Sequence, residues 1–187
     1  MSETQEFWEG KFGDAYHKRN RVDWRQRVTF WSEILELTGA RSVWEWGCGP
    51  GWNLTAIQYA SSNYPVQVYG TECNESAIVQ AIVAGLDVAS NMFLHKADLT
   101  MTVGALIHVD PDSVQDLMQK IIDTSSDYVL AVEYESEKPR EILYRGHKGK
   151  LWALPFAKYY EGMGLEKVWQ GDPGEAFDRC TATLFRK

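Results

Sequence analysis

The stretch Glu45-Trp46-Gly47-Cys48-Gly49-Pro50-Gly51 decides the fold, because it lies between a predicted strand and a predicted helix. Its three glycines let the backbone pass close to a ligand, where any Cβ atom would collide. A second acidic residue, Glu72, ends the next predicted strand. A carboxylate at the tip of the neighbouring strand can accept hydrogen bonds from both hydroxyls of a ribose. Together these features predict a nucleoside-containing ligand at the edge of a parallel sheet.

The details of the turn argue against a nicotinamide dinucleotide. The string is G-C-G-P-G rather than G-x-G-x-x-G, and Pro50 removes a backbone N–H that a pyrophosphate would need. Glu45, two residues before the first glycine, would repel a phosphate but suits a cationic ligand that carries an amino group. S-adenosylmethionine is such a ligand. The alternative is a glycine loop that only tightens the turn from strand to helix.

The turn and Glu72 resemble motifs I and II of the class I S-adenosylmethionine-dependent methyltransferases. The order strand, E-x-G-x-G-x-G, helix, strand, Glu is more specific than a glycine turn alone. The resemblance implies that Asn53 supports the turn and that Cys48 and Cys73 lie under the ligand as small side chains. The residues expected to bind the cofactor from these segments are Glu45, Gly47, Cys48, Gly49, Gly51, Asn53, Glu72, Cys73 and Val103.

Length, charge and cysteine content exclude several classes of protein. A chain of 187 residues fits one domain, and a net charge of −7 argues against nucleic acid held by broad phosphate contacts. The three cysteines have no metal-ligand spacing, and their odd number fits a reducing compartment. No apolar run reaches membrane-spanning length, and the first residues do not resemble a signal peptide. We expect a cytoplasmic monomer or homodimer without a metal.

Hydrophobic patterning predicts strands that alternate with helices. Such alternation implies an α/β fold of Rossmann-like, doubly wound type, with a mostly parallel sheet and helices on both faces. The methyltransferase resemblance implies seven strands, the last two forming a C-terminal antiparallel hairpin. Residues 1–38 are expected to form a helical cover, and 39–187 the core of a single domain. The expected strands are 41–46, 66–71, 87–90, 98–103, 127–133, 165–170 and 180–185.

Three residues are expected to begin or end helices. Gly39 follows a helical apolar pattern and offers a C-terminal cap. Asn74 can cap, through its side chain, the helix that carries Ile78, Ala81 and Ile82. Pro111, in Asp110-Pro111-Asp112, is expected at the first position of a strongly amphipathic helix.

Four further blocks are similar to the pseudaminic acid biosynthesis-associated methylases. They are Phe7-Trp8-Glu9-Gly10-Lys11-Phe12-Gly13-Asp14-Ala15-Tyr16 with Arg19-Asn20, then Gly51-Trp52-Asn53-Leu54, Gly104-Ala105-Leu106-Ile107-His108 and Tyr144-Arg145-Gly146-His147. The blocks occur in order over most of the chain. The resemblance implies an acceptor from surface-glycan biosynthesis.

The segment after the third predicted strand departs from the class I pattern. No carboxylate lies within 89–96 to bind the adenine amino group. Asn91 is expected to take that role through its amide, with Met92 or Phe93 covering the ring. The alternative is an open adenine pocket.

His108 is the best candidate for a general base, because it follows the fourth strand at the edge where ligands bind. An ordinary histidine pKa near 6.5 suits proton acceptance at neutral pH. The alternative is a histidine that packs at the start of a helix. Residues expected to contact the acceptor are Glu133, Tyr134, Tyr144, Arg145 and His147.

Tyr16 and Arg19 are expected to belong to an N-terminal lid. Arg19 could bind the carboxylate of the cofactor, while Glu45 faces its ammonium group. The alternative is an amphipathic cover helix whose polar side chains face solvent. His17 and His95 receive no role.

The sequence therefore predicts an S-adenosylmethionine-dependent methyltransferase that acts on a small polar acceptor. Two rival functions remain open. One is a non-catalytic protein that binds the cofactor or serves as a scaffold, and the other is a methyltransferase for nucleic acid or protein.

Overall fold

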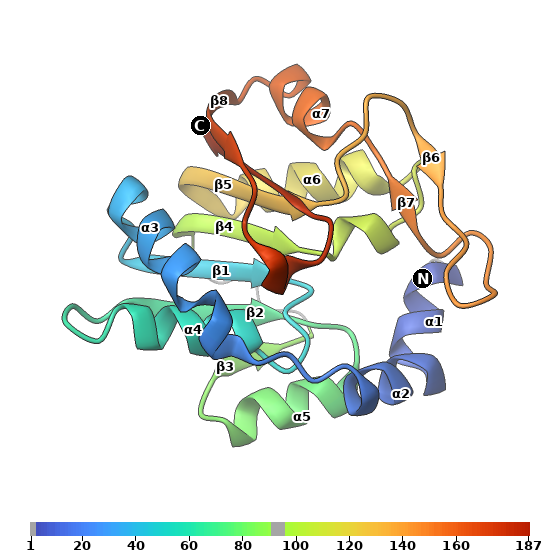
Figure 1. Cartoon of the computed structure of the whole chain (residues 1–187), viewed down its shortest axis with the longest axis horizontal. Coiled ribbons are helices and arrows are strands. Elements are labelled where there is room, and N and C mark those ends of the chain that lie inside the picture. Colours follow the sequence, from blue (N-terminus) through green and yellow to red (C-terminus); the bar gives the residue numbers. More distant parts are fainter. Residues whose placement is uncertain (1–2, 91–95) are drawn as a thin grey trace.

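The computed structural model describes residues 3–90 and 96–187 (Figure 1). Within these ranges, seven strands form one sheet in the order β3-β2-β1-β4-β5-β9-β8. The first five in this order run parallel, and β9 is antiparallel to both β5 and β8. This topology confirms the predicted doubly wound sheet with its C-terminal hairpin. The strands are β1 (Ser42–Trp46), β2 (Gln67–Thr71), β3 (Asp87–Ala89), β4 (Ala97–Val103), β5 (Ser125–Glu133), β8 (Glu166–Gly171) and β9 (Thr181–Arg186).

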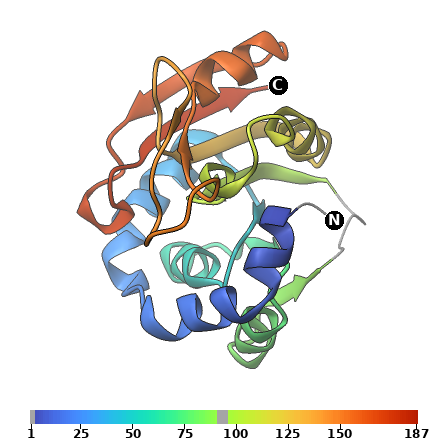
Figure 2. The ribbon, with the colours of Figure 1, turned by 90° about the vertical axis from the view of Figure 1, so that its right-hand side faces the viewer.

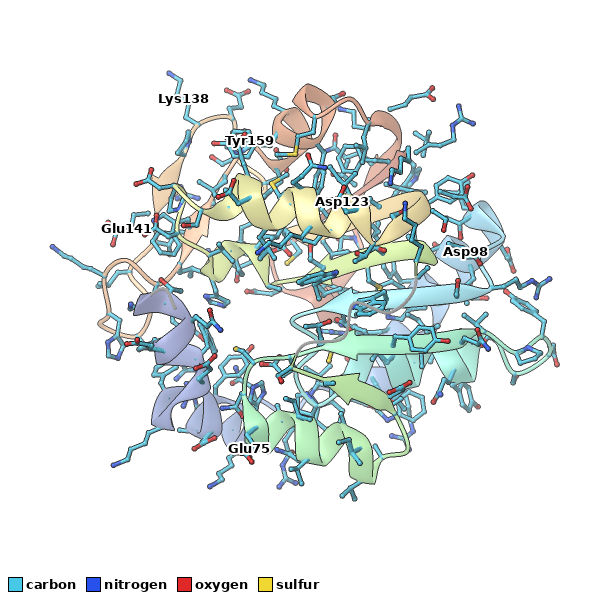
Figure 3. The ribbon with its side chains drawn as sticks, turned by 180° about the vertical axis from the view of Figure 1, so that it is seen from behind. Glu75, Asp98, Asp123, Lys138, Glu141 and Tyr159 are labelled. Atoms are coloured by element: carbon cyan, nitrogen blue, oxygen red, sulfur yellow. The ribbon has the colours of Figure 1, made fainter. Side chains whose placement is uncertain are left out.

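Helices cover both faces of the sheet, as predicted. The helices α3, α4 and α5 pack on one face, and α6 and α7 pack on the other. Figure 3, which views the molecule from behind, shows α6 lying across β4 and β5. The helices are α1 (Glu3–Glu9), α2 (Lys11–Arg19), α3 (Val28–Thr38), α4 (Trp52–Ala60), α5 (Glu75–Val83), α6 (Val114–Asp123) and α7 (Phe156–Gly162), with 3₁₀ turns η1 (Trp24–Arg27), η2 (Leu106–His108) and η3 (Glu175–Phe177).

Alternating side chains of β1 supply both halves of the core. Val43 packs with α3 and α4, whereas Trp44 and Trp46 pack on the side of α6, because successive residues of a strand point to opposite faces. Each indole N–H of these two tryptophans reaches a threonine hydroxyl: Trp44 donates to Thr71 at 2.9 Å, and Trp46 donates to Thr124 at 3.2 Å. The buried rings therefore leave no unsatisfied donor.

Two of the three expected helix caps are confirmed. Gly39 adopts φ 66° and donates to the carbonyl oxygen of Leu35 at the end of α3. The Asn74 side chain accepts from Ala77 N at 2.9 Å at the start of α5. The prediction that Pro111 is the first residue of α6 is wrong.

The helix α6 begins at Val114. A turn over 110–113 precedes it, closed by a hydrogen bond from Ser113 N to Asp110 O at 2.9 Å. The side chain of Asp110 accepts from Asp112 N at 3.0 Å. Aspartate favours such local hydrogen bonds over continuation of a helix, so the helix starts one turn later than its proline suggested.

The sheet reverses its strand order between β1 and β4, which are neighbours. In a doubly wound sheet this point leaves a crevice at the carboxyl ends of the strands. The loops after β1 and β4 meet there: a Cβ atom on Gly47 would lie 2.7 Å from the Cβ of Ala105. The topology therefore puts the glycine turn and the segment with His108 beside one another.

Two segments lie side by side over this carboxyl edge. Figure 2 looks onto the edge and shows α1 and α2 in front of it, with the segment carrying β6 (Arg140–Glu141) and β7 (Trp152–Ala153) beside them. The rings of Phe7 and His147 join the two segments, with centroids 5.1 Å apart. The small β6–β7 sheet and α7 are elements that the sequence did not predict.

A bilayer-spanning helix is not found among the described residues, since every helix there is too short or too polar.

Candidate functional site

The three residues Gly47, Gly49 and Gly51 give the turn a left-handed backbone. Gly47, Gly49 and Gly51 adopt φ values of 69°, 54° and 83°, which favour glycine. A Cβ atom on Gly51 would collide with the side chain of Leu86. Gly47 N donates to Thr71 O at 2.7 Å, which fixes the turn to the end of β2. The turn therefore holds its shape through contacts that only glycine allows.

Glu45 is buried, with 1% of its surface exposed, and one of its oxygens is satisfied. Oε1 accepts from Asn53 Nδ2 at 2.6 Å, whereas Oε2 has no hydrogen-bond partner within 3–90 and 96–187. Burial raises the pKa of Glu45 to about 8; Asn53 and Arg27 lower it, and Glu72 and Glu133 raise it further. A buried polar atom without a partner is costly. Once the carboxyl group loses its proton, this oxygen suits a ligand that donates.

Glu72 is anchored by three backbone N–H groups. Its Oε1 accepts from Cys73 N and Asn74 N, and its Oε2 accepts from Gly49 N, each at 2.8 Å. A carboxylate offers about four acceptor positions, so one position on Oε2 stays available to a hydroxyl. The carboxylate thus joins the glycine turn to the segment that follows β2.

The cysteines of the two motifs are packing residues in the structure. Cys48 is buried, and its sulfur lies 2.6 Å from where Gly70 would carry a Cβ atom. Burial raises the pKa of both thiols, for Cys73 to about 12. Neither cysteine is a thiolate at neutral pH, so neither is a nucleophile in this state. Val103 is half-buried at the end of β4, against the core.

His108 ends η2, and its ring is fixed in one tautomer. The ring atom Nδ1 lies 2.8 Å from the carbonyl oxygen of Lys150. A carbonyl only accepts, so Nδ1 carries the proton and Nε2 has a free lone pair in the neutral ring. Burial lowers the pKa of His108 to about 4. The rings of Trp8 and Tyr144 lie 4.4 and 5.2 Å from it and pack against the imidazole, which stays partly exposed.

Glu133 supports the turn that carries His108. Its Oε1 accepts from Ala105 N and Leu106 N, and its Oε2 accepts from Ile107 N, all at 3.2 Å. Burial raises the pKa of Glu133 to about 7, and these backbone donors lower it. The carboxyl group thus caps η2 from the end of β5.

The neighbouring Tyr134 reaches a different segment. Its hydroxyl donates to the carboxylate of Asp178, in the turn before β9. Burial raises the Tyr134 pKa above its ordinary value, and the Asp178 carboxylate adds to this effect. Tyr134 therefore ties the end of β5 to the end of the chain.

The Tyr144-Arg145-Gly146-His147 block is a tight two-residue turn. Tyr144 and His147 exchange backbone hydrogen bonds of 3.0 and 2.8 Å. The two central residues have positive φ, 49° at Arg145 and 86° at Gly146, as a type I′ turn requires. Arg145 and His147 are exposed, while Tyr144 packs on Phe12 with ring centroids 5.8 Å apart. The turn presents an arginine in a conformation that glycine or asparagine would adopt more easily.

The N-terminal helices close the edge through an aromatic cluster. Trp8 packs edge-on against Tyr16 at 5.2 Å, and Arg19 lies over the ring of Phe12 at 4.9 Å. Asn74 Nδ2 donates to Trp8 O and to Asp14 Oδ1, both at 3.1 Å. Tyr16 and Arg19 thus belong to a cover that motif II itself holds in place.

The structure brings in two residues that sequence reasoning missed. His17 is buried, and its Cε1 lies 3.3 Å from where Gly49 would carry a Cβ atom. Arg27 is buried and donates to Asn53 Oδ1 at 2.8 Å. Neither residue belongs to a motif, and both reach the site from segments distant in sequence. Asn91 and Met92, the residues predicted beside the adenine, lie outside the described residues.

Solved structures with a similar fold are methyltransferases. Magnesium protoporphyrin IX methyltransferase from Synechocystis PCC 6803, with bound S-adenosylmethionine, has a TM-score of 0.72 at 11% identity; the match covers 100% of this chain and 98% of that one. The 1,6-didemethyltoxoflavin-N1-methyltransferase from Burkholderia thailandensis, with bound 1,6-didemethyltoxoflavin and S-adenosylhomocysteine, has a TM-score of 0.74 at 16% identity; the match covers 100% of this chain and 91% of that one. The sugar N-methyltransferase from Streptoalloteichus sp. ATCC 53650 has a TM-score of 0.70 at 12% identity over 95% and 93%.

This chain has the class I methyltransferase fold. No protein-family model matches it, and no curated protein is similar to it in sequence. The similarity to solved structures therefore establishes the fold, and the narrower resemblance to the pseudaminic acid-associated methylases stays a prediction.

Proposed function

We propose that this protein transfers a methyl group from S-adenosylmethionine to a small polar acceptor. The unpartnered Oε2 of Glu45 is the observation that carries this proposal. It is a buried carboxylate oxygen directly before the glycine turn, where an ammonium group could donate to it. The cofactor's sulfonium makes the methyl carbon reactive, so the protein has to orient the acceptor and accept a proton.

The described residues fit the rest of such a cofactor. The free position on Glu72 Oε2 would accept from a ribose hydroxyl, and the glycine turn, with Cys48 beneath it, would allow close approach. Asn53 holds Glu45 in place, and Arg19 would neutralise the carboxylate of the amino-acid end. Cys73, Val103 and Tyr16 would line the sides. Asn91 and Met92, which lie outside the described residues, are the ones that we propose for the adenine from sequence alone.

His108 would act as the general base through Nε2, because the Lys150 carbonyl directs the single proton to Nδ1. Arg145 and His147 are exposed in the turn whose Tyr144 ring packs on His108, and they would bind the acceptor together with Tyr144. Glu133 and Tyr134, at and just after the end of β5, would contact the same acceptor. An arginine favours an acceptor that carries a carboxylate or phosphate.

A sugar or sugar nucleotide of surface-glycan biosynthesis is the acceptor that we propose. The order of the family-like blocks supports it, and one protein of similar fold is a sugar N-methyltransferase. The proposal includes a cytoplasmic location and a monomer or homodimer.

Calorimetric titration with S-adenosylhomocysteine tests the cofactor assignment. Glu72→Ala should weaken binding by well over tenfold, because it leaves ribose hydroxyls and three backbone N–H groups unpaired. The affinity of Glu72→Ala for 5′-methylthioadenosine, which has the same ribose, should fall by the same factor. Wild-type protein that binds neither ligand, or an unchanged affinity in Glu72→Ala, would remove the assignment.

A cofactor-binding protein without turnover is the second candidate. The packing of Trp8 on His108, at 4.4 Å, favours it, because the indole occupies one side of the proposed base. Incubation with S-adenosylmethionine and a panel of amino sugars, sugar acids and sugar nucleotides separates the two functions by mass spectrometry. A nucleic-acid substrate has less support, given the net charge of −7.

A further inference from the structure

Arg27 is a buried cation that makes no direct ion pair in the described part of the chain. It lies at the end of η1 with 9% of its surface exposed. Its Nε and Nη2 atoms donate to the carbonyl oxygen of Ala176 at 3.2 and 2.7 Å, and its guanidinium lies over the ring of Phe177 at 4.4 Å. A charge removed from water needs such partners, so the segment 174–178 holds Arg27 firmly.

The remaining edge of the guanidinium faces Asn53. Nη1 donates to Asn53 Oδ1 at 2.8 Å, and Asn53 Nδ2 in turn donates to Glu45 Oε1 at 2.6 Å. Arginine has only donors, so the amide oxygen must face it. The amide nitrogen then has to face Glu45, and the reverse orientation would oppose donors to donors.

We propose that Arg27 is a positioning residue for the amino-acid end of the cofactor: it orients the Asn53 amide, which engages Glu45 Oε1 and leaves Oε2 for the cofactor's ammonium group. This inference depends on the proposed function, since it assigns a specific task within the same site. Arg27 acts through Asn53 and Glu45, and it touches neither the cofactor nor the acceptor.

The contacts of Arg27 also connect the Glu45 region with the end of β5, which carries Glu133. Ala176 and Phe177, which hold Arg27, directly precede Asp178, and Asp178 accepts from Tyr134 at the end of β5. One turn before β9 therefore touches both the chain of residues that ends at Glu45 and the strand that carries Glu133.

Two ligands that differ in the amino-acid end provide the test. S-adenosylhomocysteine has the ammonium group, and 5′-methylthioadenosine shares the adenosine and sulfur but lacks it. Arg27→Met keeps an unbranched apolar side chain against Phe177 and removes the donor to Asn53. This variant should bind S-adenosylhomocysteine about tenfold more weakly, as expected for a lost hydrogen bond to a charged group. Its affinity for 5′-methylthioadenosine should be unchanged.

A double-mutant cycle with Glu45→Gln tests whether Arg27 affects cofactor affinity through Glu45. If Arg27 acts through Glu45, Arg27→Met should cost no further S-adenosylhomocysteine affinity in the Glu45→Gln background. Arg25→Met is the matched control: Arg25 is on the same turn, with a side chain 72% exposed, and its replacement should leave both affinities unchanged.

Equal weakening of both ligands by Arg27→Met, or additive effects of the two substitutions, would overturn the inference. The failure of the proposed function looks different. In that case the wild-type protein binds neither ligand, or Glu45→Gln leaves the affinity for S-adenosylhomocysteine unchanged.

Discussion

His108 Nδ1 lies 2.8 Å from the carbonyl oxygen of Lys150, a residue 42 positions further along the chain. This contact fixes the proton on Nδ1 and leaves the lone pair of Nε2 available. Because burial lowers the pKa of His108 to about 4, the ring is neutral at physiological pH. The pair therefore defines the direction in which the proposed base can accept a proton.

Replacement of this base should affect turnover more than binding. His108→Gln should reduce kcat by about 10²–10⁴, the usual contribution of general-base catalysis, and leave the affinity for S-adenosylhomocysteine unchanged. Lys138→Gln, at an exposed position (Figure 3), is the control. Wild-type kcat should be level through neutral pH and fall only as pH drops towards 4. Full activity in His108→Gln would exclude His108 as the base, whereas a rate that titrates near 6.5 would contradict only the lowered pKa of its ring.

Cofactor affinity should depend on the ionisation of Glu45, whose pKa burial raises to about 8. An ammonium group favours the carboxylate form, so binding below pH 8 has to release the proton. We expect affinity for S-adenosylhomocysteine to rise from pH 6 to about 8, by about tenfold per pH unit at most. The affinity for 5′-methylthioadenosine should not follow this pattern. Calorimetry in buffers of different ionisation enthalpy would detect the released proton, and its absence would contradict the role of Glu45.

The same group should make the ligand-free protein less stable as pH rises. The folded pKa of about 8 exceeds the unfolded value, near 4.3 for glutamate. The folded state therefore binds more protons between these values, and the free energy of unfolding falls with increasing pH across that window. Glu45→Gln keeps an acceptor for Asn53 and cannot ionise, so urea denaturation should show a smaller decrease. An identical pH dependence in both proteins would refute the buried ionisation.

The glycine turn should not tolerate a Cβ atom at Gly47. There the φ of 69° combines with a Cβ position 2.7 Å from Ala105, so Gly47→Ala adds a clash to about 1–2 kcal/mol of backbone strain. Gly85→Ala is the matched control, because φ is 84° and no atom lies within 4 Å. Both variants should unfold at lower urea concentration, and Gly47→Ala alone should lose S-adenosylhomocysteine binding. Retained binding in Gly47→Ala would argue against a cofactor at this turn.

Arg145 offers a test of function against stability. Its φ of 49° in the tight turn is unfavourable for arginine and acceptable for asparagine. Arg145→Asn should therefore raise the free energy of unfolding by roughly 1 kcal/mol, and should raise KM for the acceptor if the guanidinium binds it. Urea denaturation and steady-state kinetics measure the two effects. A more stable variant with unchanged KM would show that Arg145 has no part in acceptor binding.

Local patterns predicted most elements of the fold. The glycine turn, the cap at Gly39 and the cap at Asn74 depend on contacts within a few residues, and all three are as predicted. The start of α6 was wrong because Asp110 forms its own local turn. The β6–β7 sheet was missed because each strand has only two residues, too few for a recognisable alternation.

The sequence by itself determined the doubly wound sheet and the place of the glycine turn, because strand period, glycine spacing and carboxylate position are properties of neighbouring residues. Only the tertiary structure decided which groups complete the site. The bond from Arg27 to Ala176 spans 149 residues, and the bond from His108 to Lys150 spans 42. No local pattern encodes such pairs, since they form only when the packed core brings distant segments into one low-dielectric space where polar groups need partners.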